Sequence, residues 1–152
     1  MRTFALAMSL LLLSSQALAL EVAGALYLER KTTSREGLLD DPGDKLIRMY
    51  FVYRKVEKEK IVEAFADGLR KNPPAVAGTA DANAFLSWFG SDFIAGDRVD
   101  IALASDGTVS ADRNGRRLGT LRNPDLSRAV LRIWFGEKPA DSGLEKGMLG
   151  LD

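Results

Sequence analysis

The segment from residue 98 to residue 121 constrains the fold most, because it carries two tight-turn signals between alternating strands. Residues 98–104 alternate between apolar side chains and charged or small ones. The dipeptides Asp106-Gly107 and Asn114-Gly115 follow, and both suit the left-handed backbone of two-residue β-hairpins. The segment therefore predicts a three-stranded antiparallel meander with one apolar face.

Further strands and helices are predicted on either side of this meander. The helical pattern is clearest where Ile61, Phe65 and Leu69 recur every fourth residue and form one apolar stripe. The predicted elements are strands over 22–28 and 46–53, helices over 57–71 and 81–89 (the latter with Asp81 as N-cap), a helix from Asn123-Pro124 to Gly136, and a short helix from Asp141, with a polar loop over 31–42. This order has few parallel crossovers, so the predicted fold class is α+β, an antiparallel β-sheet with a layer of helices on one face.

The composition excludes several kinds of site. The chain has no histidine and no cysteine, which removes Ser-His-Asp triads, His-ligated zinc, thiolate chemistry and disulfides. Its 21 Lys and Arg balance its 21 Asp and Glu, so it lacks the basic surplus that nucleic-acid binding needs. We expect no catalytic residue, no metal, no cofactor and no nucleic-acid partner.

The first nineteen residues have the pattern of a secretory signal peptide. Arg2 precedes an apolar stretch from Phe4 to Leu13, and Ala17-Leu18-Ala19 has the small-x-small form of a cleavage site. The apolar stretch is shorter than the about 20 residues of a membrane-spanning helix. We therefore expect residues 1–19 to be cleaved and residues 20–152 to form a single domain in the periplasm that is not embedded in a membrane.

Two charged clusters are interpreted as exposed turn residues and not as binding sites. Arg113, Arg116 and Arg117 flank a predicted hairpin turn, where such residues are common, so an anion site there is the weaker interpretation. The run from Asp40 to Asp44 lacks the ligand order of a calcium loop, so it predicts a turn. The two tryptophans fall on predicted helices beside the inward stripes, which favours the core.

Several short motifs resemble, in order and spacing, those of chalcone isomerase-like proteins of the exported bacterial branch. The motifs are a small-x-Tyr-Leu strand at residues 24–28, the segment at 53–56 with the helix after it, Gly96-Asp97, the two hairpin turns, residues 131–136 with Pro139, and residues 147–150. The resemblance covers residues 22–150. It implies an open-faced β-sandwich, in which helices cover one face of a large antiparallel sheet.

The resemblance implies two functions for the cleft between sheet and helices. Plant chalcone isomerases close a flavonoid ring there without a cofactor, and non-catalytic relatives bind fatty acids with an Arg and a Tyr. In this chain the family's early-strand Arg has no counterpart, the strand Thr falls on Val22, and the late-helix Thr falls on Ile133. A site without its cation and hydroxyl donors cannot stabilise negative charge on an oxygen, so flavonoid cyclisation is not expected.

We therefore expect a non-catalytic protein that binds a small apolar, fatty acid-like ligand between sheet and helices. Val22, Gly24 and Leu26 share one face of their strand, and small residues there leave space beside the sheet. Ile133 and Trp134 are the helix residues expected to close over that space. A cofactor-free isomerase or lyase of chalcone isomerase type stays open as one alternative. A ligand-free interaction module is another, in which an open sheet edge pairs with a second copy or another protein.

Overall fold

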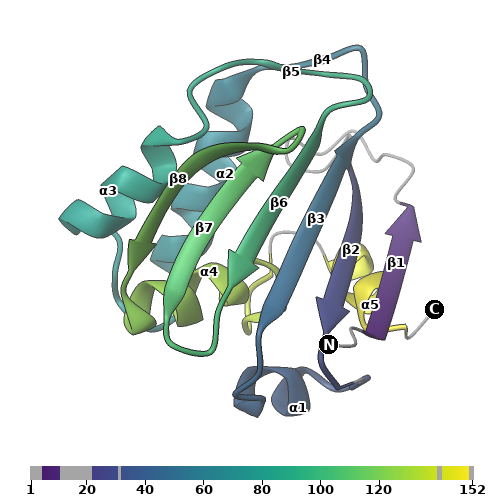
Figure 1. Cartoon of the computed structure of the whole chain (residues 1–152), viewed down its shortest axis with the longest axis vertical. Helices are drawn as coiled ribbons and strands as arrows, with labels where there is room; N and C mark the ends of the chain where they lie inside the picture. The colour runs from purple at the N-terminus through teal and green to yellow at the C-terminus, as the bar shows by residue number, and fades with distance from the viewer. Residues whose placement is uncertain (1–4, 11–21, 31, 140–141, 151–152) are drawn as a thin grey trace.

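The computed structural model of the chain describes residues 5–10, 22–30, 32–139 and 142–150. Its elements, in chain order, are β1 (Ala5–Leu10), β2 (Val22–Leu28), α1 (Arg35–Asp40), β3 (Lys45–Phe51), β4 (Lys55–Val56), α2 (Lys58–Lys71), α3 (Ala80–Ser87), β5 (Phe93–Ile94), β6 (Arg98–Leu103), β7 (Thr108–Arg113), β8 (Arg116–Arg122), α4 (Pro124–Phe135) and α5 (Ser142–Met148). Helices α2, α3, α4 and α5 lie behind one face of the sheet, which confirms the predicted α+β class (Figure 1). No helix within the described ranges is long and apolar enough to cross a membrane.

The main sheet has six antiparallel strands in the order β1-β2-β3-β6-β7-β8. The predicted meander is confirmed as β6, β7 and β8, and its second turn has Asn114 at φ 52° and Gly115 at φ 82°. Two consecutive left-handed residues are the geometry of a type I′ hairpin, which twists in the same sense as the strands it joins. Strands β4 and β5 form a separate two-stranded sheet that the sequence patterns did not predict.

The helix boundaries follow from their caps. Helix α4 begins as predicted, because the Asn123 side chain accepts a hydrogen bond from the backbone N–H of Leu126 and Pro124 occupies the first helical position. The predicted cap of α3 is wrong. Thr79 caps this helix by accepting from the N–H of Ala82, which leaves the Asp81 side chain to accept a hydrogen bond from Asn123 at 2.9 Å.

The polar loop predicted over residues 31–42 contains a helix, α1. Ser34 caps it by accepting from the backbone N–H of Gly37 at 3.0 Å, and Leu38 is fully buried beneath it. Arg35 donates to Glu145 of α5 at 2.9 Å, which ties α1 to the other end of the chain. An isolated helix this short is unstable in water, so α1 forms because of its tertiary contacts and not because of a local periodic pattern.

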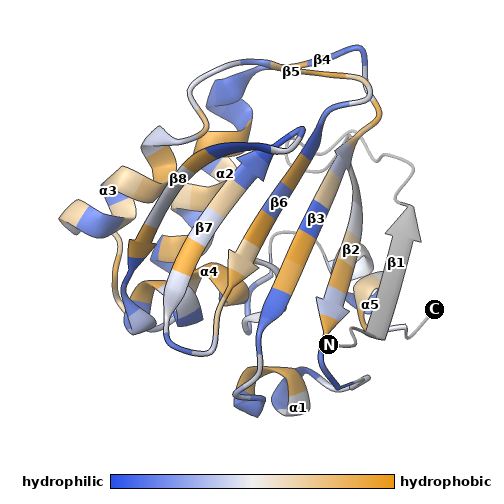
Figure 2. Cartoon of the chain, in the orientation of Figure 1, coloured by the Kyte–Doolittle hydropathy of each residue, from blue (hydrophilic) through white to orange (hydrophobic). Residues whose placement is uncertain are grey.

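The hydrophobic core lies between the sheet and the helices. Strands β3 and β6 each contribute one face to this core, because buried and half-buried residues alternate along them. Hydrophobic and hydrophilic residues alternate along the same strands in Figure 2. Phe65 of α2 stands at the centre of an aromatic cluster, with the rings of Phe85, Phe89 and Trp134 centred 5.0–5.9 Å away. This packing fixes α2, α3 and α4 relative to one another.

The structure places part of the predicted leader in the sheet. Residues Ala5–Leu10 form β1 and pair with β2 along its length, and α5 packs against both strands. In the full-length chain β1 covers the edge beside β2. The expected open edge concerns residues 20–152 and stays a prediction. Cleavage after residue 19 stays a prediction, and residues 1–4 and 11–19 lie outside the described residues.

Candidate functional site

The predicted strand residues lie on the helix-facing side of β2. Leu26 is 1% exposed and pairs with Ile47, and Gly24 is buried and pairs with Met49. Val22 begins the strand opposite Phe51, but its side chain lies outside the described ones. The alternation of β2 therefore presents a small residue, Gly24, within an apolar face of the sheet.

The predicted helix residues lie in the same apolar layer, and their described contacts are with α2. Ile133 is fully buried, and a Cβ built on Gly68 of α2 would lie 3.0 Å from its Cγ atoms. Trp134 is 4% exposed, and its ring is centred 5.5 Å from that of Phe65. Both side chains join Leu26 in one buried cluster, so they act as core residues in this structure.

The buried polar side chains in the described part of the chain all have structural partners. They are Lys45, Asn72, Asp97 and Glu145. Asn72 donates to the carbonyls of Gly68 and Lys138 at 3.0 Å, which joins the end of α2 to the segment after α4. Lys45 donates to the carbonyls of Asp41 and Gly43, and burial lowers its pKa. These groups hold the chain together instead of facing a substrate.

The other face of the sheet carries a polar cluster that links three strands. Arg48 of β3 binds Asp100 of β6 with two hydrogen bonds of 2.6 and 3.0 Å, and it donates to the Tyr27 hydroxyl of β2 at 3.3 Å. Burial and a hydrogen bond with Tyr50 raise the pKa of Tyr27, so its hydroxyl stays protonated at neutral pH. The Asp100 carboxylate already occupies the Arg48 guanidinium, so this cluster has no free cation to hold an oxyanion.

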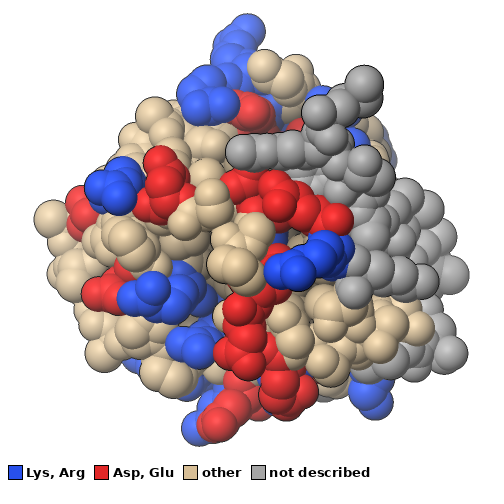
Figure 3. Space-filling view, turned by 60° about the horizontal axis from the view of Figure 1, so that its bottom comes forward, with Lys and Arg blue, Asp and Glu red and all other residues tan. Residues whose placement is uncertain are grey.

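Two cavities lie away from the predicted ligand residues. A groove of about 420 Å³ runs between α2 and α3 over Val62, Leu86 and Phe89. A second cavity, of about 290 Å³, lies where the β6–β7 turn meets the start of α4, and Asp40 and Asp106 line it. Figure 3 shows acidic side chains gathered in a band across the face seen from the α1 end. Neither lining includes Gly24, Leu26, Ile133 or Trp134.

Two of the three arginines at the second hairpin turn, Arg113 and Arg117, pair with carboxylates of this chain. Arg113 donates to Asp97 at 2.6 Å and lies over the Phe93 ring, with its guanidinium carbon 4.3 Å from the ring centre. Arg117 pairs with Asp112 at 2.5 Å. The sequence analysis names Asp97 only within the Gly96-Asp97 motif and missed its role as the acceptor that joins β5 to this turn.

A family model described as chalcone isomerase-like matches residues 20–150 of the chain. The chain belongs to the chalcone isomerase-like family. The predicted resemblance is thus confirmed. A search of curated protein sequences finds no match.

The fold agrees with that of a solved member of this structural class. The chain superposes on the crystal structure of an Arabidopsis thaliana fatty-acid binding protein with a TM-score of 0.68 and 17% sequence identity, covering 97% of this chain and 85% of the other. At this identity the match establishes the fold. The chalcone isomerase-like open-faced β-sandwich predicted from the sequence is confirmed.

Proposed function

We propose that the mature chain is a non-catalytic periplasmic protein that binds a small apolar, fatty acid-like molecule between its sheet and its helices. One observation carries the proposal: Gly24 and Leu26 form a buried, purely apolar face on β2, the strand that removal of residues 1–19 would place at the sheet edge. Without β1, the sides of β2 and α5 that β1 contacts would be uncovered. That gap adjoins the layer that holds Ile133 and Trp134.

Two comparisons support this proposal. The family match begins at residue 20, directly after the predicted leader, which supports cleavage there and export to the periplasm. The structural neighbour is titled a fatty-acid binding protein, and its fold matches that of this chain with a TM-score of 0.68. Fold alone does not assign a ligand, so the apolar β2 face is the physical reason for expecting an acyl chain.

The first test is native mass spectrometry of the protein purified from a periplasm. We expect an intact mass that lacks residues 1–19 and a bound adduct of a few hundred daltons, restored by palmitic acid after delipidation. An intact mass that retains residues 1–19 would contradict the leader. Failure of the delipidated protein to take up palmitic acid or decanoic acid would contradict the ligand class.

Replacing Gly24 by leucine should abolish this uptake, because the added side chain would fill the space beside β2. Ala102→Leu adds the same side chain to β6 on the opposite face of the sheet and serves as the control. Thermal unfolding of both variants checks that the fold is intact. Uptake by Gly24→Leu equal to that of the parent chain would show that the ligand does not lie beside β2.

A second candidate function is strand-mediated association through β2. The observation that favours it is the pairing of β1 with β2, since β1 shows that this edge accepts a six-residue strand. We expect residues 20–152 to dimerise more strongly than the full-length chain, with β2 pairing antiparallel to its copy. Light scattering at increasing concentration measures this, and equal monomer fractions for the two chains would contradict it.

A further inference from the structure

The exposed large hydrophobic side chains gather at one end of the molecule. In the part of the chain that the structure describes they are Val52, Tyr53 and Ile94, with 42%, 41% and 56% of their surface exposed. Val52 and Tyr53 follow β3, and Ile94 lies in β5 opposite Lys55 of β4. We call this surface, made of residues 52–55 and 94–96, the β4–β5 tip. A cluster of exposed apolar side chains on a protein surface marks a contact with a partner or a membrane.

The β4–β5 tip is held rigidly from below. The backbone N–H of Gly96 donates to the carbonyl of Phe51, and the N–H of Phe51 donates to the carbonyl of Asp97, both at 2.9 Å. The Phe51 and Phe93 rings stack beneath the tip with centres 4.4 Å apart. Because these contacts fix the backbone, Val52, Tyr53 and Ile94 are presented to solvent without the loss of freedom that ordering a loose loop would require.

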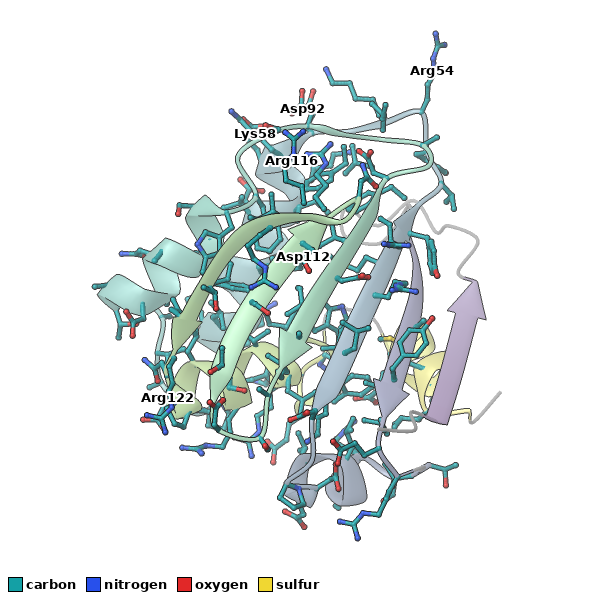
Figure 4. The ribbon with its side chains drawn as sticks, viewed as in Figure 1. Arg54, Lys58, Asp92, Asp112, Arg116 and Arg122 are labelled. Carbon is teal, nitrogen blue, oxygen red and sulfur yellow. The ribbon has the colours of Figure 1, made fainter. Side chains whose placement is uncertain are left out.

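Basic side chains lie close to the β4–β5 tip. In Figure 4, Arg54 extends away from the body at this end, and Lys58, Asp92 and Arg116 lie further along the same end. The side chains of Arg54 and Arg116 have no hydrogen-bond or ion-pair partner among the described residues. Lys55 and Asp92 form a loose, exposed pair at 3.6 Å. The free cations are therefore available to an anionic partner.

The shape of the β4–β5 tip favours a flat partner over a peptide. Figure 1 shows β4 and β5 at the extreme end of the molecule, so the tip projects. Val52, Tyr53 and Ile94 lie outside both cavities described above, on this projecting surface. Tyrosine and arginine at the margin of an apolar surface place their polar ends at the level of lipid headgroups while their apolar parts enter the membrane.

From this geometry we infer that the β4–β5 tip docks the protein on the surface of an anionic phospholipid bilayer. Val52, Tyr53 and Ile94 enter the headgroup region, and Arg54 contacts lipid phosphates. The acidic band at the α1 end faces away from the bilayer, which fixes the orientation (Figure 3). This inference does not depend on the proposed apolar ligand, because no residue of the tip belongs to the β2 face.

The test uses Ile94→Trp in the full-length chain as a probe of contact. We expect its fluorescence emission to shift to shorter wavelength with vesicles of phosphatidylglycerol and phosphatidylethanolamine, and not with phosphatidylcholine vesicles. Ala77→Trp is the control, because Ala77 is exposed in the loop after the C-terminal end of α2, the end farther from the tip. An equal shift at both positions, or none at Ile94→Trp, would overturn the inference and leave a protein partner as the explanation of the exposed side chains.

A charge reversal tests whether electrostatic attraction contributes to membrane binding. Any binding through residues 1–19 is the same in all variants, so it cancels when the variants are compared. Arg54→Glu should lower the partition coefficient on phosphatidylglycerol vesicles about 25-fold at low salt, because it changes two unit charges, each worth about fivefold near an anionic surface. Arg122→Glu makes the same change at the opposite end of the molecule (Figure 4) and should change binding much less. Equal losses for the two variants would show that net charge, not the tip, attracts the protein.

Discussion

Replacing Asp97 by alanine should lower the free energy of unfolding by about 3–5 kcal/mol, because it removes the buried carboxylate of an ion pair together with the three hydrogen bonds that this carboxylate accepts. Asp97 is 7% exposed. Its Oδ2 accepts from the Arg113 guanidinium at 2.6 Å and from the backbone N–H of Ile94 at 2.9 Å, and its Oδ1 accepts from the Asn114 amide at 2.9 Å. One carboxylate thus joins the β5 segment to the β7–β8 turn.

Chemical denaturation of the parent chain and the variant measures this effect, which corresponds to a fall in melting temperature of roughly 10 °C. Asp112→Ala is the matched control, because Asp112 forms a similar but more exposed pair with Arg117. We expect the control to lose about 1 kcal/mol or less. Equal losses for the two variants would mean that the buried network contributes no more than a surface pair.

The same network makes stability depend on pH. Burial alone would raise the pKa of Asp97, but the hydrogen bonds from Ile94, Asn114 and Arg113 lower it below its ordinary value. A carboxyl whose pKa is lower in the folded state stabilises the fold fully above its unfolded pKa, which is about 4, and that stabilisation is lost as the pH falls through the folded pKa. The parent chain should therefore lose more stability between pH 5 and pH 2 than Asp97→Asn. Parallel pH profiles would contradict this account.

The fold was predictable where local patterns agree with tertiary structure. The dipeptide at 114–115 lies in the predicted turn, with Asn114 and Gly115 both in left-handed backbone. At 106–107 only Gly107 is left-handed, and the turn between β6 and β7 is longer than the predicted two residues. The Asn123 cap and the stripe of Ile61, Phe65 and Leu69 are also local, and each lies where the sequence predicts it. Such features need no knowledge of which distant residue lies opposite.

The missed features depend on contacts between residues far apart in the sequence. Helix α1 is stabilised by the pair of Arg35 with Glu145, and Asp97 acquires its role only when Arg113 reaches it from another strand. The candidate site residues Ile133 and Trp134 also depend on contacts that the sequence does not reveal. Their apolar character and inward position were predictable, but the close approach of Ile133 to Gly68 of α2 was not.

Replacing Gly119 by alanine should destabilise the protein by about 1–3 kcal/mol, the range found when a methyl group is forced into a well-packed site. A Cβ at this position would lie 2.1 Å from Cε2 and 2.2 Å from Nε1 of Trp88. Gly119 belongs to β8, where the register shifts between Ala111 and Asp112 of the neighbouring strand. A glycine in a strand commonly marks the close approach of another group. Here it leaves room for the Trp88 ring, which packs the end of α3 against the sheet.

A double-mutant cycle separates this packing from the intrinsic cost of a changed strand residue. Trp88→Ala removes the ring, so Gly119→Ala in that background should cost much less than in the parent chain. Gly90→Ala is the control, since its nearest neighbour would be the Ser87 carbonyl at an ordinary 3.5 Å, and it should change stability by no more than about 0.5 kcal/mol. If Gly119→Ala costs the same with and without Trp88, the destabilisation arises in β8 itself. The contact with Trp88 would then not be what requires a glycine at this position.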